Sequence, residues 1–122
     1  MAAYRQPEKG RIIMEYTFTA ANFEEEVLHS EIPVLVDFYA DWCGPCKQVA
    51  PILRDLAILY KNDIVVYKVN VDKEKELAAA FGIQSIPTFL FIPKEGQPQI
   101  SMGALPREEF VKQIDTFLLK KK

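Results

Sequence analysis

The spacing of hydrophobic residues changes several times along the chain, and each change predicts a different element. Two runs, Pro33–Tyr39 and Ile64–Val71, are apolar on both faces, which is typical of central strands covered by helices on either side. Between these runs, apolar residues recur at helical spacing, at Val49, Ile52, Leu53, Leu56 and Tyr60. The pattern therefore predicts a helix from Cys43 to about Tyr60, directly after the first buried strand.

Shorter segments continue this alternation of strands and helices. The further elements that the pattern predicts are an edge strand at Ile12–Phe18, a short helix capped by Thr19 or Asn22 with Val27 facing the core, a helix at Lys73–Phe81 capped by Asp72 and ended by Gly82, strands at Phe89–Ile92 and Gln99–Met102, and a final helix from Pro106. Such alternation predicts an α/β domain. We assign residues 12–120 to this domain and residues 1–11, which are polar, to a flexible arm, with a partner-binding arm as the alternative.

Composition narrows the possible functions. The chain has 122 residues, 49% of them hydrophobic, which suits one domain with one core. The formal net charge is −2 and no basic block suggests nucleic acid. No apolar stretch approaches the roughly 18 residues that cross a bilayer, and the N-terminus lacks a signal-like apolar run. We therefore expect a cytoplasmic monomer that binds neither membranes nor nucleic acid, with a periplasmic location as the alternative if a signal segment was removed ahead of Met1.

The chemistry of the chain is concentrated in its only two cysteines, Cys43 and Cys46, which lie where the first buried strand meets the predicted helix. A helix N-terminus favours negative charge, so we expect the Cys43 thiolate to be stabilised and reactive at neutral pH. Cys46 lies one turn further along the helix and is expected to be the more buried thiol. The pair suits thiol–disulfide exchange, in which Cys43 attacks a disulfide in another protein and Cys46 then resolves the mixed disulfide.

Three other interpretations of this cysteine pair are possible. It could be half of a zinc site, but zinc takes about four ligands, and His29 is the only histidine in a chain with no further cysteine. It could be a structural disulfide, but a bridge between such close residues constrains little of the unfolded chain. The cysteines could also be small core residues, which the strand-to-helix context disfavours. We therefore expect no metal and no cofactor.

A charged residue interrupts each of the two buried strands. A buried carboxyl at Asp37 would have a raised pKa and could exchange protons with Cys46, whereas a strand-end aspartate reaching solvent is the alternative. Lys68 breaks the second run, and an opposite charge nearby would make both burials less costly. Its ammonium group could equally extend to the surface.

Several separated motifs in this chain resemble those of the thioredoxin family. They are Val36-Asp37-Phe38-Tyr39-Ala40, Trp42-Cys43-Gly44-Pro45-Cys46-Lys47, Ala50-Pro51, Val69-Asn70-Val71-Asp72, Ile86-Pro87-Thr88 and Gly103-Ala104. The resemblance covers about residues 14 to 119. It implies a thioredoxin fold, with a central mixed five-stranded sheet flanked by four helices. One departure is Tyr39, where many members of the family carry tryptophan.

The resemblance also implies a function and a set of roles. It implies a protein-disulfide reductase that receives electrons from a separate thioredoxin reductase and acts on client proteins with disulfides. Cys43 and Cys46 would form the redox-active disulfide, Asp37 would carry the proton and Lys68 would lie close to Asp37. The contact surface for clients would consist of Trp42, Gly44, Pro45, Ile86, Pro87, Gly103 and Ala104, with the Ile86–Pro87 peptide in the cis form. The alternatives are an oxidoreductase or isomerase outside the cytoplasm and a binding subunit without redox turnover.

Overall fold

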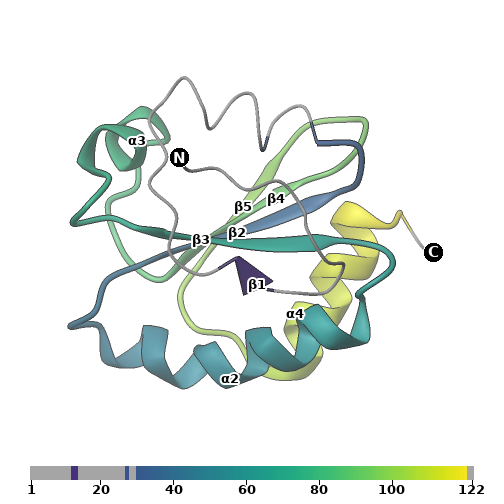
Figure 1. Ribbon diagram of the computed structural model, residues 1–122, viewed down its shortest axis with the longest axis horizontal. Coiled ribbons are helices and arrows are strands. Elements are labelled where there is room, and N and C mark those ends of the chain that lie inside the picture. Colours follow the sequence, from purple (N-terminus) through teal and green to yellow (C-terminus); the bar gives the residue numbers. More distant parts are fainter. Residues whose placement is uncertain (1–11, 14–26, 28–29, 121–122) are drawn as a thin grey trace.

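Five strands form one mixed sheet in the computed structural model, which describes residues 12–13, 27 and 30–120 (Figure 1). Along the chain, the elements are β1 (Ile12–Ile13), β2 (Val34–Tyr39), α2 (Gly44–Leu59), β3 (Val65–Asn70), α3 (Lys75–Ala80), β4 (Thr88–Ile92), β5 (Gln99–Met102), α4 (Arg107–Gln113) and the π-helical turn η2 (Ile114–Leu118). The strand order is β1-β3-β2-β4-β5. The strands β1, β3 and β2 are parallel to one another, whereas β4 is antiparallel to both β2 and β5.

Successive side chains along each strand point to opposite faces of the sheet, so the core is divided into two clusters, one on each face. Val34, Val36 and Phe38 of β2 pack in one cluster with Leu77 of α3, and Leu35 packs in another with side chains of α2, α4 and η2. Strands β3 and β4 divide their residues in the same way. Figure 1 shows α2 and α4 on one side of the sheet and α3 on the other. Both faces of β2 are thus buried, as its continuous apolar run predicts.

Helix α2 begins where its sequence favours a helix start. Cys43 is the N-cap, in an extended conformation, and Pro45 occupies the first turn, where a missing N–H costs no hydrogen bond. Apolar residues at helical spacing then pack against the sheet, among them Val49 and Leu53. At the other end, the Tyr60 hydroxyl donates a hydrogen bond of 3.0 Å to Asp115 Oδ1 in η2, which ties α2 to the C-terminal helix.

The end of the sheet next to Cys43 collects residues from four strands. Tyr39 ends β2 opposite Asn70 at the end of β3, and Thr88 at the start of β4 pairs with Met102 at the end of β5. The strand β4 also pairs with β2 there, through Phe38 and Thr88. The residues that follow or precede these strand ends are therefore brought together around the start of α2.

Most of the predicted elements are confirmed, and one helix start is wrong. The helix α3 begins at Lys75 rather than Lys73, with Glu74 as its N-cap and no side-chain cap, so Asp72 does not cap it. Its end is as predicted, because Gly82 has a φ of +66° and the amides of Gly82 and Ile83 donate to the last turn. The strand β1 lies at the sheet edge, as expected, and Val27 is buried. Three predicted segments lie outside the described residues: the remainder of the strand predicted at Ile12–Phe18, the remainder of the helix predicted before His29, and the arm at residues 1–11.

Candidate active site

Cys43 and Cys46 form a disulfide at the start of α2. Their Cα atoms are 5.3 Å apart. The Cys46 N–H donates a hydrogen bond of 3.1 Å to Cys43 Sγ, so the sulfur caps the helix N-terminus as a serine or threonine oxygen would. In the reduced protein, this N–H and the positive end of the helix dipole would stabilise a thiolate on Cys43.

The two cysteines are equally buried, which corrects the expectation that Cys46 would be the more buried. Cys43 is 4% exposed and Cys46 is 5% exposed. Both pack in one cluster with Tyr39 and Ala40, against Val71 and Ile86. The helix position of Cys43 alone suggests exposure, but residues from three other segments cover it. Gly44 and Pro45, which lie between the two cysteines in the sequence, are exposed.

The segment before β4 forms one boundary of the site. The Ile86–Pro87 peptide is cis, as the resemblance implies, and Ile86 packs against the cysteine cluster. Pro87 is buried, and its carbonyl oxygen accepts a hydrogen bond of 2.8 Å from the Gly103 N–H, which ties the end of β5 to this segment. Gly103 has a φ of +93°, and a Cβ added there would meet nothing within 4 Å. Glycine at this position is therefore explained by backbone conformation rather than by crowding within the chain.

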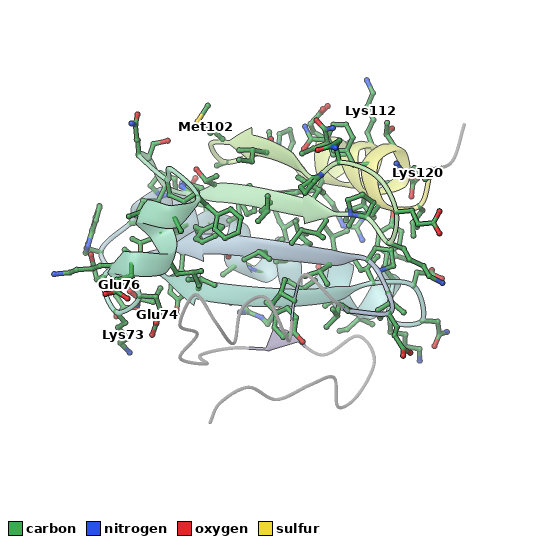
Figure 2. The ribbon with its side chains drawn as sticks, turned by 90° about the horizontal axis from the view of Figure 1, so that it is seen from above. Lys73, Glu74, Glu76, Met102, Lys112 and Lys120 are labelled. Carbon is green, nitrogen blue, oxygen red and sulfur yellow. A yellow bond between two sulfur atoms is a disulfide. The ribbon has the colours of Figure 1, made fainter. Side chains whose placement is uncertain are left out.

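An exposed methionine lies beside Gly103 and was not among the predicted site residues. Met102 is 69% exposed and its side chain projects from the end of β5 (Figure 2). Ala104, on the other side of Gly103, is also exposed. The pattern predicts only a strand at Met102, because alternation along an edge strand does not reveal which of its residues stay exposed. The surface around Gly103 is thus more apolar than the motif Gly103-Ala104 alone indicates.

Trp42 is held beside Cys43 by a contact that the sequence analysis missed. The indole is 70% exposed, and its Nε1–H donates a hydrogen bond of 2.8 Å to Asp72 Oδ2. Asp72 is itself fixed by Asn70, whose Oδ1 accepts hydrogen bonds from the backbone N–H groups of Asp72 and Lys73 at 2.9 and 3.2 Å. Asn70 is buried at the end of β3. The carboxyl of Asp72 therefore orients the indole instead of capping α3.

Removing the Asp72 carboxyl should loosen Trp42 and weaken client binding. We expect Asp72→Ala to lower the fluorescence anisotropy of Trp42, the only tryptophan in the chain, and to raise KM for a protein disulfide by about two- to fivefold with little change in kcat. The effect is limited because the hydrogen bond lies at the surface. Asp72→Asn keeps an acceptor oxygen and should resemble the parent protein. An unchanged anisotropy in Asp72→Ala would show that the contact does not orient the indole.

Asp37 is a buried acid on the sheet face that α2 covers. It is 1% exposed, and alternation places it between Leu35 and Tyr39 on this face. Its Oδ1 accepts no hydrogen bond among the described residues. Burial raises the pKa of Asp37 to about 7, although the positive charge of Lys68 acts to lower it. Of the two predicted environments, buried and solvent-exposed, the structure has the buried one.

Lys68 lies next to Asp37 but is not ion-paired with it. The two residues are partners in the parallel register of β2 and β3, which confirms that they are neighbours. Lys68 is partly buried, and its Nζ lies 4.4 Å from the centroid of the Tyr39 ring. This is a cation–π contact. Because Tyr39 packs with the cysteines, the contact connects the Asp37–Lys68 pair to the disulfide cluster.

The described residues contain no group of three or more histidine, cysteine, aspartate or glutamate side chains that could hold a metal ion. None of the helices within those residues is both long and apolar enough to pass through a membrane. The chemistry that the site itself offers is thiol–disulfide exchange, through a cysteine pair at a helix start with a buried carboxyl on the same face of the sheet. A site of this kind on this fold defines a thiol–disulfide oxidoreductase.

Comparisons with known proteins identify the family. A model of the thioredoxin family matches residues 15–116. The chain is 44% identical to a thioredoxin of Borreliella burgdorferi over 100 residues, which is 82% of this chain and 86% of that one. It is 46% identical to thioredoxin 1 of Synechococcus elongatus over 101 residues, covering 82% and 94% of the two chains. The chain therefore belongs to the thioredoxin family, whose members are protein-disulfide oxidoreductases.

A solved structure supports the same conclusion for the fold. A single-site mutant of thioredoxin from Halobacterium salinarum superposes with a TM-score of 0.77 at 27% identity, over 92% of this chain and 95% of that one. The expected thioredoxin fold and the function as a thiol–disulfide reductase are thus confirmed.

Proposed function

We propose that this chain is a general reductase of protein disulfides in which Cys43 is the nucleophile, Cys46 the resolving thiol and Asp37 the proton carrier. The observation that carries the proposal is the capping of α2 by Cys43 Sγ, with the Cys46 N–H directed at that sulfur. In the reduced protein this stabilises a thiolate on Cys43, next to the exposed residues Gly44 and Pro45.

The reaction follows in two exchange steps. Cys43 Sγ, as the thiolate, attacks one sulfur of the client disulfide, a mixed disulfide forms, and the other client sulfur leaves as a thiolate that takes a proton from water. Cys46 then loses its proton to Asp37, attacks Cys43 Sγ, and releases the second client thiolate. Asp37 suits this second step because a carboxyl with a pKa of about 7 can accept and return a proton near neutral pH.

The surface around the disulfide supports capture of an extended client segment. Trp42, Gly44 and Pro45 adjoin the cysteines in the sequence and are exposed. Ile86 packs against the cysteine cluster, and the Gly103 N–H donates a hydrogen bond to the Pro87 carbonyl oxygen. Ala104 follows Gly103 and is exposed. We assign these residues to client contact, and Lys68 to adjusting the charge balance of Asp37. The exposed apolar groups, above all Trp42 and Met102, suit apolar segments of client proteins.

Two electrons must be returned to the disulfide after each turnover. The chain carries no phosphate-binding glycine motif for a nucleotide, so we assign this step to a separate thioredoxin reductase. The proposal includes a monomer working in the cytoplasm, where client disulfides form transiently and are reduced.

The equilibrium redox potential of the Cys43–Cys46 pair tests this proposal. We expect a value of about −270 mV in a defined thiol buffer, as for a reducing thioredoxin, with Cys43→Ser as the blank. A value of about −120 mV would instead identify a strong oxidant and would overturn both the reductase assignment and the cytoplasmic location.

A further inference from the structure

Lys68 has two possible partners on the same face of the sheet, and the structure places it on one of them. Asp37 stands opposite Lys68 in the register of β2 and β3, and Tyr39 lies two residues further along β2. The ammonium group lies over the Tyr39 ring, 4.4 Å from its centroid. The structure contains no ion pair between Lys68 and Asp37, and Asp37 Oδ1 accepts no hydrogen bond among the described residues.

An aromatic ring and a carboxylate differ in what they do to this ammonium. The ring attracts the cation by its quadrupole but takes no proton and needs no hydrogen bond. A carboxylate in direct contact with the ammonium would be held in its ionised form. A Lys68 bound to the ring therefore still stands near Asp37 but does not satisfy the carboxylate.

No other cation in the described residues faces Asp37 on this side of the sheet. Beside it in the sheet are Lys68 of β3 and Phe89 of β4, which does not ionise. On β2 the neighbours on the same face are Leu35 and Tyr39, and α2 contributes the disulfide cysteines and apolar residues. From α4, Phe110 packs edge to face against Phe89. The electrostatic environment of the Asp37 carboxyl thus depends mainly on where the Lys68 ammonium group lies.

We propose that Tyr39 is a positioning residue for Lys68: its ring holds the ammonium group off the Asp37 carboxyl and so keeps that carboxyl free to exchange a proton with Cys46. The proposal rests on the role assigned above to Asp37 and adds a residue that acts through Lys68. It gives a function to the position at which this chain carries tyrosine where many thioredoxins carry tryptophan, since both side chains offer a ring face.

The test is the titration of the Asp37 carboxyl carbon by NMR in the oxidised protein. We expect Tyr39→Phe, which keeps the ring, to leave the midpoint unchanged. In Tyr39→Leu the ammonium is released to Asp37, and the midpoint should fall by about one pH unit or more. An unchanged midpoint in Tyr39→Leu would overturn the proposal, and so would an equal fall in Tyr39→Phe, which would assign the effect to the hydroxyl group.

A double-mutant cycle separates this mechanism from water entering a loosened core, which would also lower the midpoint. With Lys68→Met as the background, Tyr39→Leu should have no further effect, because the ammonium that it releases is gone. A fall of the same size in that background would assign the effect to packing and overturn the proposal.

A measurement on the unsubstituted protein covers the case in which Tyr39→Leu does not fold. The ε-methylene protons of Lys68 should show upfield ring-current shifts, and ordinary shifts would overturn the proposal. Failure of the underlying function is distinguishable from failure of this inference. If Asp37→Asn reduced client disulfides at the parent rate at every pH, the proton-carrier role would be wrong, whereas the Tyr39 titrations would still report where Lys68 lies.

Discussion

Cys43→Ser is expected to abolish the reduction of protein disulfides, lowering the rate by at least about a thousandfold. The physical reason is that a serine hydroxyl is not ionised at neutral pH and cannot replace a thiolate in disulfide exchange, even at a helix N-terminus with an N–H directed at it. The measurement is the rate of reduction of a protein disulfide with a chemical thiol reductant as the electron source, corrected for the reductant alone.

The matched variant is Cys46→Ser, which keeps the nucleophile and removes the resolving thiol. It should form the mixed disulfide with a client in stoichiometric amount and release it slowly, so that mass spectrometry detects one client chain per protein. The two variants should therefore differ in product as well as in rate, because only Cys46→Ser should accumulate a mixed disulfide with the client. If Cys43→Ser instead formed the stable mixed disulfide, the assignment of nucleophile and resolving thiol would be reversed.

Burial of Asp37 should make the oxidised protein less stable as pH rises from about 4 to about 7. Its pKa is 3.8 when exposed and about 7 in the folded protein. For a group whose folded pKa is raised, the stabilising contribution is fully present below the unfolded pKa and is lost as pH rises through the folded pKa, because the folded protein then holds a buried charge. The difference between the two pKa values corresponds to about 4 kcal/mol in the free energy of unfolding between roughly pH 3.5 and pH 8.5.

The matched comparison is Asp37→Asn, which has a similar shape and no ionisation. We expect the free energy of unfolding of Asp37→Asn relative to the parent to increase by about 4 kcal/mol from roughly pH 3.5 to pH 8.5, measured by denaturant unfolding of the oxidised proteins at each pH. Taking the difference at each pH cancels the other titrating groups, which both proteins share. Two curves that run parallel across this range would show that Asp37 ionises in the folded protein as it does in solution.

The fold could be predicted from the sequence because each buried strand and helix carries its own signature. The two-faced apolar runs became β2 and β3, and the helical spacing after Cys43 became α2, capped by Cys43 itself. The family resemblance correctly implied that Asp37 and Lys68 are neighbours. The strand order and the cis peptide at Pro87 came only from family resemblance, because both depend on contacts between segments far apart in the chain.

The incorrect predictions also arise from contacts between segments that are far apart in the chain. Asp72 is a suitable cap for a following helix, but its carboxyl binds the indole of Trp42, which lies 30 residues away in the sequence. Helix position alone predicts that Cys43 is more exposed than Cys46, whereas residues from other segments bury both cysteines. Local patterns thus identified the reacting groups, and the contacts that orient them required the structure.

The disulfide links the N-cap of α2 to the first turn of the same helix, so no two elements of the fold are joined by it. A bridge between residues three apart closes too short a loop to order the unfolded chain appreciably. Oxidation, reduction, folding and unfolding form a closed thermodynamic cycle. The free energies of unfolding of the oxidised and reduced forms therefore differ by the same amount as the redox potentials of the folded and unfolded protein, when about 30 mV is counted as 1.4 kcal/mol. Unfolding curves of the oxidised and reduced protein thus measure how strongly the folded site itself favours the dithiol or the disulfide.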